Sequence, residues 1–124
     1  PDFHLKLGRG SLSDIEFTAQ LLQLQYGVKA TGTLDALRAL SDSDVLAADD
    51  ASVLAEAYVF CERVRNRWYL VNSAPGDSLP TQPESLLWLA RALDTAPSSL
   101  REDYRRVTRR ARKVVERIFY GLPG

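Results

Sequence analysis

Residues 99–121, SLREDYRRVTRRARKVVERIFYG, decide the fold class of this chain. Apolar side chains recur along this stretch in alternating steps of four and three, at Leu100, Tyr104, Val107, Ala111, Val114 and Ile118. The spacing places one apolar stripe along one side of an α-helix, and Gly121 with Pro123 beyond it is typical of a helix end. Because the stripe is shorter than the roughly three to four heptads of a coiled coil, we expect it to be buried in a helical bundle.

The starts of the first and last helices are predicted from local capping patterns. Ser13 and Glu16 fit a capping box, which places the start of the first helix at Asp14. Ser99 and Glu102 fit a second capping box at the start of the last helix. Both helices are therefore expected to begin with a serine cap.

Further helices are predicted between these two. One begins after Thr33, and the longest pattern spans residues 51–71 after a cap at Asp49 or Asp50. Pro83 suits the first position of another helix, and the turn-rich residues before it form a loop. No strand pattern competes, so we expect an all-α fold: a single bundle of about five helices with one proline-rich connecting loop.

Charge is unevenly distributed, although the net charge of the 124 residues is zero. Residues 101–117 hold eight of the sixteen bases and only three of the sixteen acids. The remainder of the chain is acidic, so we expect the last helix to attract it. The basic face is typical of a solvated surface opposite the apolar stripe, and the alternative is a docking surface for an acidic partner through Arg105, Arg109 and Arg112.

Several functional classes are excluded by composition. The single cysteine, Cys61, can form no internal disulfide and is expected to be a buried structural thiol. His4 is the only histidine, which leaves too few ligands for a zinc site. No apolar run approaches about 18 residues and no signal-like start is present, so we expect a cytoplasmic chain with no membrane partner. With zero net charge, and with Tyr104 and the Phe119–Tyr120 pair expected in the core, no nucleic-acid partner is predicted.

A basic, glycine-broken segment runs into the first helix in residues 5–23, LKLGRGSLSDIEFTAQLLQ. Gly8 and Gly10 let the backbone turn and approach another surface closely, and Lys6 and Arg9 place two cations ahead of the helix. Such a segment suits an anion, although it is neither a P-loop nor a dinucleotide-binding fingerprint.

Asp14 and Glu16 follow in the first turn of that predicted helix. Together with Lys6 and Arg9 they are candidates for the lip of a phosphate-binding cleft. The alternative is that the glycines only turn the chain, the bases are solvated, and the two acids interact favourably with the helix dipole.

The order of residues along nearly the whole chain resembles one protein family. The matching positions are residues 6–10, 12, 14–17, 20–24, 31, 33–34, 36–37, 54–58, 63, 65–66, 77, 79–80, 89–91 and 107–112. They are similar to the helical, PII-uridylyltransferase-type domain of bifunctional glutamine synthetase adenylyltransferase/adenylyl-removing enzymes. Ser11 departs from the family pattern, which usually has a second glycine there, and the connection after Gly27 is shorter than the family's.

The resemblance implies a role within a larger enzyme. In that family two nucleotidyltransferase domains alternate with two helical domains; one half attaches AMP to a tyrosine of glutamine synthetase and the other removes it. The Gly8-Arg9-Gly10 run and the arginine-rich last helix are similar to the C-terminal, AMP-attaching half. Residues 1–124 are therefore expected to be one helical domain, with residues 1–12 as the junction to its own nucleotidyltransferase domain.

The same resemblance defines the expected ligands and partners. ATP and Mg²⁺ belong to the parent enzyme, and this fragment alone is expected to bind no cofactor or metal and to be inactive, because no strand carries the closely spaced aspartates that hold Mg²⁺. Arg65 and Asn66 are candidates for lining the cleft. Glutamine synthetase is the expected partner and a PII signal protein is a further candidate. The alternatives are a regulatory module that docks either of these proteins, or a generic helical interaction domain.

Overall fold

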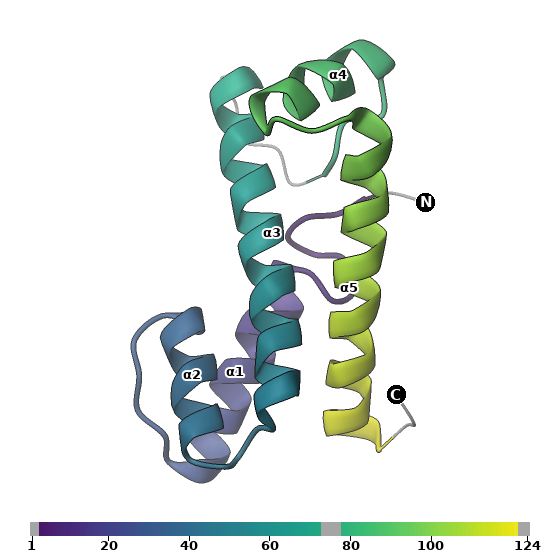
Figure 1. Ribbon diagram of the computed structural model, residues 1–124. Coiled ribbons are helices and arrows are strands. Elements are labelled where there is room, and N and C mark those ends of the chain that lie inside the picture. Colours follow the sequence, from purple (N-terminus) through teal and green to yellow (C-terminus); the bar gives the residue numbers. More distant parts are fainter. Residues whose placement is uncertain (1–2, 73–77, 122–124) are drawn as a thin grey trace.

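The chain, seen in a computed structural model that describes residues 3–72 and 78–121, folds as an all-α bundle. The helices are α1 (Leu12–Tyr26), α2 (Thr33–Asp42), α3 (Ala48–Asn72), α4 (Pro83–Ala92) and α5 (Pro97–Tyr120). The long helices α3 and α5 run side by side in opposite directions, α1 and α2 pack at one end of the pair, and α4 lies across the other (Figure 1). Within the described residues no strand forms, only an isolated antiparallel bridge between His4 and Ser78. The predicted fold class is confirmed.

The start of α1 differs from the predicted capping box. The helix begins at Leu12, with Ser11 at the N-cap position, and no serine side chain caps it. Instead the preceding backbone folds back, so that the amides of Leu12 and Ser13 donate to the carbonyls of Leu5 (3.1 Å) and Lys6 (2.8 Å). These carbonyls satisfy amide donors that a capping side chain would otherwise serve. The prediction that Ser13 and Glu16 form a capping box is therefore wrong.

Three other predicted helix starts are also wrong by a few residues. Helix α2 includes Thr33, which was predicted to cap it, and Gly32 occupies the N-cap. Helix α5 begins at Pro97, whose fixed φ angle suits a first helical position, and Ala96 rather than Ser99 occupies the N-cap. Helix α3 begins at Ala48, so that Asp49 and Asp50 lie in its first turn instead of capping it. Carboxylates in a first turn still interact favourably with the helix dipole. The predicted helix end at Gly121 is confirmed, with a left-handed φ of 65°.

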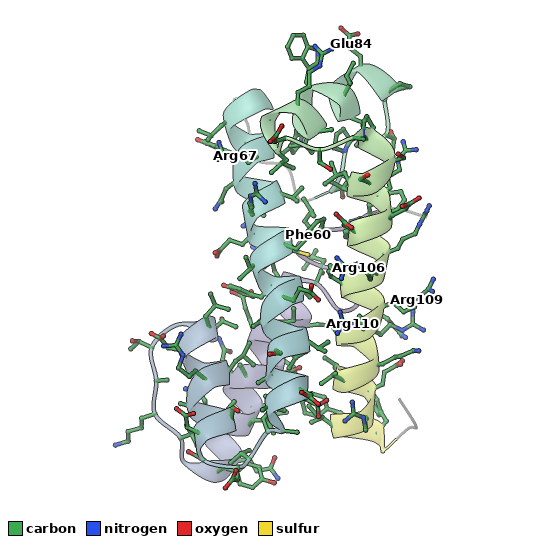
Figure 2. The ribbon with its side chains drawn as sticks, viewed as in Figure 1. Phe60, Arg67, Glu84, Arg106, Arg109 and Arg110 are labelled. Atoms are coloured by element: carbon green, nitrogen blue, oxygen red, sulfur yellow. The ribbon has the colours of Figure 1, made fainter. Side chains whose placement is uncertain are left out.

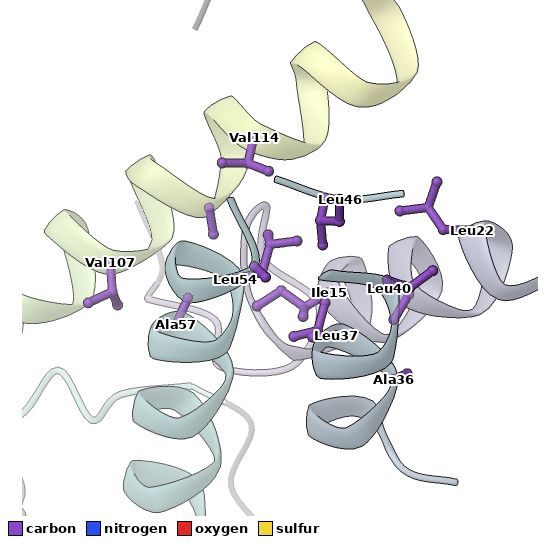
Figure 3. Packing of buried hydrophobic residues seen from close by; sticks show 13 residues of the cluster. Ile15, Leu22, Ala36, Leu37, Leu40, Leu46, Leu54, Ala57, Val107 and Val114 are labelled. Atoms are coloured by element: carbon purple, nitrogen blue, oxygen red, sulfur yellow. The ribbon is translucent and has the colours of Figure 1, made fainter. Parts of the chain in front are cut away.

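The larger hydrophobic core lies where α1 and α2 meet the α3–α5 pair (Figure 3). Its large fully buried side chains are Ile15, Leu37, Leu40, Leu54 and Val107. The predicted stripe of α5 is confirmed, because its first five residues are buried and Ile118 packs at the edge of this core. Tyr120, which was expected in the core, is instead 73% exposed at the last residue of α5.

A second core joins the N-terminal segment to α4, to the C-terminal half of α3 and to the N-terminal half of α5. It contains Leu5, Leu12, Cys61, Val64, Leu79, Leu86, Leu89, Leu93, Leu100 and Tyr104. Cys61 is fully buried, as predicted, and burial raises the pKa of its thiol to about 12. In the part of the chain that the structure describes, no helix has both the length and the apolar character to cross a bilayer.

Candidate functional site

The segment ahead of α1 is fixed along the flank of α5. The phenol of Tyr104 donates a hydrogen bond to the carbonyl of His4 (2.5 Å), and the ring of Phe3 packs edge-on against that of Tyr104 at 5.4 Å. On its other side the segment is tied to the residues before α4, because the amide of Leu79 donates to the carbonyl of Phe3 (2.8 Å). Burial, with a smaller contribution from Cys61, raises the pKa of Tyr104 to about 12, so the phenol stays a donor at neutral pH.

Gly10 makes the closest backbone approach to α5. Its φ angle is +74°, and a Cβ atom built on it would lie 2.1 Å from the carbonyl oxygen of Thr108 and 2.9 Å from the amide nitrogen of Arg112. At Gly8 a Cβ would lie 2.8 Å from the carbonyl oxygen of His4. Side chains at these positions would collide with backbone atoms, which explains the glycines as packing requirements. They bring Arg9 alongside the arginines of α5.

A small pocket of about 180 Å³ opens at this contact, and four of its five lining residues are arginines: Arg9, Arg105, Thr108, Arg109 and Arg112. We call it the arginine pocket. Three of the arginines come from one stripe of α5, spaced by four and three residues, and the fourth comes from the glycine-broken segment. Two sets of residues that the sequence analysis treated separately therefore share one site.

The arginine pocket contains more positive than negative charge. Glu116, one turn beyond Arg112, is the carboxylate beside it: its Oε2 lies 3.9 Å from Nη1 of Arg9 and 3.5 Å from Nε of Arg112. The guanidinium of Arg105 lies 5.0 Å from the centroid of the Phe3 ring, within cation–π range. Among the described residues no carboxylate forms an ion pair with Arg109. Of the four arginines that line the pocket, two therefore pair with Glu116, and the described residues provide no carboxylate pair for the other two.

The opposite stripe of α5 is neutralised by α3. Arg106 and Arg110 both bind the carboxylate of Glu56, at 3.3 and 3.0 Å, and Arg117 makes two hydrogen bonds to Asp50 at 2.9 and 3.0 Å. In Figure 2 Arg106 and Arg110 lie on the side of α5 that faces α3, and Arg109 points away from it. These pairs confirm that the acidic part of the chain attracts the basic helix. Among the described residues, the arginines of α5 that line the pocket have no such partner from α3.

The other predicted site residues do not join the arginine pocket. Lys6 is half-buried and contributes its carbonyl to the start of α1. The carboxylate of Asp14 accepts the amide of Gly10 (2.9 Å), so it holds the glycine turn. Glu16 lies near Tyr58 of α3, whose pKa is raised by burial and further by the charges of Glu62 and Glu16.

Arg65 and Asn66 lie in the C-terminal half of α3 and do not line the arginine pocket either. Sequence reasoning missed Thr108 and Glu116, which belong to the pocket region. Their positions could have been found from the helical spacing, because residues 105, 109, 112 and 116 follow one stripe of α5. Among the described residues no group of three or more histidine, cysteine, aspartate or glutamate side chains could hold a metal ion.

Comparisons with known proteins identify sequence relatives of this chain. The family model described as GlnD PII-uridylyltransferase matches residues 1–122. Similar curated proteins include the bifunctional glutamine synthetase adenylyltransferase/adenylyl-removing enzymes of Streptomyces avermitilis (45% identical over 129 aligned positions, 98% of this chain) and Leifsonia xyli (44% over 131 positions, 99% of this chain). The corresponding enzyme of Mycolicibacterium smegmatis is 42% identical over 129 positions, covering 98% of this chain.

The chain spans 13% of the length of each of these relatives. Their alignments extend over more positions than the 124 residues of the chain, so the relatives contain residues that this chain lacks.

Proposed function

The chain belongs to the GlnD PII-uridylyltransferase family, and from this premise we propose that it is the helical domain of the adenylylating half of a glutamine synthetase adenylyltransferase. In that role it completes the cleft in which its own nucleotidyltransferase domain transfers AMP from ATP to a tyrosine of glutamine synthetase, and so takes part in nitrogen regulation. The observation that supports this proposal most directly is the match over residues 1–122 together with the identity of 45% to the Streptomyces avermitilis enzyme.

The chemistry of the side chains fits a supporting role. ATP brings its Mg²⁺ to a set of closely spaced carboxylates, and the described residues contain no group of three acidic, histidine or cysteine side chains that could hold a metal. Guanidinium groups instead recognise phosphate oxygens by paired hydrogen bonds. In the proposed assembly the catalytic carboxylates belong to the nucleotidyltransferase domain, and this domain contributes cations at the edge of the cleft, with Lys6 and Arg9 as the candidates.

A double substitution in the full-length parent enzyme tests this role. Lys6→Ala with Arg9→Ala is expected to reduce AMP transfer at subsaturating ATP through a higher KM for ATP, because two cations near the phosphates are lost. Arg38→Ala is the matched control, because Arg38 is an exposed arginine of α2 at the far end of the bundle from this segment. Unchanged AMP transfer in the double variant would contradict the proposed contribution of these residues.

A second candidate function, a module that docks glutamine synthetase or a PII signal protein, is favoured by one observation. Arg105, Arg109 and Arg112 form an exposed stripe that α3 does not neutralise. Reversing these three arginines to glutamate is expected to slow association with an acidic partner, and the loss should be largest at low salt. Arg91→Glu, at the exposed end of α4, controls for the general change in charge. If the triple variant binds both proteins as the parent does, docking through this stripe is excluded.

A further inference from the structure

We infer that the arginine pocket is a binding site for a small phosphate-type oxyanion, of the size of inorganic phosphate or pyrophosphate. This inference does not rest on the proposed function, since it follows from the charges, distances and dimensions of the pocket itself.

The first argument is that two guanidinium groups already converge on one oxyanion. Nη1 of Arg9 and Nε of Arg112 approach the same atom, Oε2 of Glu116, at 3.9 and 3.5 Å. A carboxylate oxygen carries the same kind of charge and lone pairs as a phosphate oxygen. The carboxylate of Glu116 therefore shows that both arginines can reach a shared anion, and it supplies at most one negative charge for them to share.

The second argument is the excess of positive charge. Arg105 and Arg109 line the same pocket, while the carboxylate of Glu116 pairs only with Arg9 and Arg112. Arginine stays protonated at any physiological pH, and like charges held together gain stability from an anion that lies between them. A phosphate with two negative charges, or pyrophosphate with more, matches this excess better than a single carboxylate does.

The third argument is the contrast between the two faces of α5. Arg106 and Arg110 occupy neighbouring positions on the same helix, yet both are bound by Glu56 of α3. Within the part of the chain that the structure describes, the pocket arginines lack such partners from α3 and are left available for an anion from solution. The fold supplies α3 carboxylates to one stripe and leaves the other to face the glycine-broken segment.

The fourth argument is size and rigidity. Pockets for drug-sized ligands are typically about 300–1,000 Å³, whereas the arginine pocket measures about 180 Å³ and so suits a phosphate group better than a whole nucleotide. The segment that contains Arg9 and helix α5 form the two sides of the pocket. Their main chains are held close together, because Gly10 lies directly against the backbone of Thr108 and Arg112. A concave site of this volume also favours a small anion over the broad contact that an acidic protein would make.

The test is calorimetric titration of the 124-residue chain with sodium pyrophosphate and, separately, with inorganic phosphate. We expect both anions to bind, and pyrophosphate to bind more tightly than phosphate. The salt concentration is about 0.1 M, at which distant surface charges are screened. Arg109→Gln with Arg112→Gln is expected to weaken pyrophosphate binding by roughly tenfold or more, because charge-assisted hydrogen bonds are lost. Arg106→Gln with Arg110→Gln removes the same charge from the same helix and is expected to change the affinity by less than about twofold.

A third variant is expected to change the affinity for pyrophosphate in the opposite direction. Glu116→Gln removes the carboxylate that competes for Arg9 and Arg112, and it is expected to tighten pyrophosphate binding. Circular dichroism confirms that each variant is folded. The inference is overturned if the two double variants lose affinity equally, if neither phosphate nor pyrophosphate binds at millimolar concentration, or if the chain binds poly-glutamate in preference to both.

Discussion

The α-carbon of Gly10 faces the carbonyl oxygen of Thr108 so closely that an added methyl group would lie 2.1 Å from that oxygen. Contacts of this kind involve only main-chain atoms, so no side chain can move to relieve them. This contact fixes the segment that contains Arg9 to the middle of α5, and it is what gives the arginine pocket its shape.

Replacing Gly10 should therefore destabilise the fold more than replacing a glycine of similar conformation. Gly10→Ala introduces both left-handed strain and a clash with Thr108, and we expect the free energy of unfolding to fall by more than about 2 kcal/mol. Gly27→Ala is the matched control, because Gly27 has a φ of +67° and no atom within 4 Å of an added Cβ. Gly27→Ala introduces only the left-handed strain, so it should lower the free energy of unfolding by about 1 kcal/mol. Urea denaturation measures both, and equal losses would show that the close approach is unimportant.

Core packing predicts a second contrast. Leu54 of α3 is completely buried between the helices, and Leu54→Ala should lower the free energy of unfolding by about 2–5 kcal/mol. Leu24 of α1 is 82% exposed, and Leu24→Ala should change the free energy of unfolding by less than about 0.5 kcal/mol. Thermal and urea unfolding measure the difference. Similar values for the two variants would contradict the observed position of α3 in the core.

Alkaline pH should destabilise the protein through two buried groups. In the folded chain the pKa values of Cys61 and Tyr104 are raised to about 12, while in the unfolded chain they lie near 9.0 and 10.0. Above the lower values the unfolded chain has lost protons that the folded chain retains, so the free energy of unfolding falls as pH rises from 9.0 toward about 12. Well below pH 9.0 these two groups add no slope, because both are protonated in the folded and the unfolded chain.

Urea denaturation at a series of pH values measures this slope. Cys61→Ala lowers stability at every pH because it removes buried volume, but it should also flatten the alkaline slope. The slope, and not the absolute stability, is the informative quantity. A variant with the same alkaline slope as the parent would show that the thiol does not contribute.

The ion pair between Asp50 and Arg117 should stabilise the α3–α5 contact more than the pairs at Glu56. Asp50 is largely buried, with 16% of its side chain exposed, and it accepts two parallel hydrogen bonds from the guanidinium. Both partners of the Glu56 pairs are about half exposed, so solvent screens them. Asp50→Asn is therefore expected to lower the unfolding midpoint more than Glu56→Gln.

A neighbouring residue separates the ion pair from the helix dipole. Asp49 lies in the same first turn of α3, is exposed, and forms no ion pair within the described residues. Asp49→Asn thus removes the dipole interaction alone. If Asp49→Asn lowered the midpoint as much as Asp50→Asn, the contribution of the Arg117 pair would be disproved.

Local patterns were sufficient to predict the helices and the start of α4 at Pro83, but not the starts of the other helices. The stripe from Leu100 to Val114 is encoded by spacing within one helix, so it could be read directly from the sequence. The start of α1 depends on hydrogen bonds from Leu12 and Ser13 to carbonyls of the preceding segment. A capping pattern considers only the side chains near the helix start, and it cannot detect a backbone that folds back to provide the same acceptors.

The candidate site was predictable only in pieces. Arg9 and the arginines of α5 were each recognised as cations suited to an anionic partner, but their convergence joins positions about a hundred residues apart. That convergence depends on Gly10 packing against Thr108, a contact set by the tertiary fold. Lys6, Arg9, Asp14 and Glu16 were expected to act together because they are neighbours in sequence, yet Asp14 binds the Gly10 amide and Glu16 lies near Tyr58.

The position of Phe3 has a consequence for longer proteins that contain this chain. Its ring packs on Tyr104 and under the guanidinium of Arg105, so Phe3 lies against the N-terminal third of α5 and not at either tip. A domain joined ahead of Phe3 would therefore be attached at the flank of α5, the helix that also lines the arginine pocket.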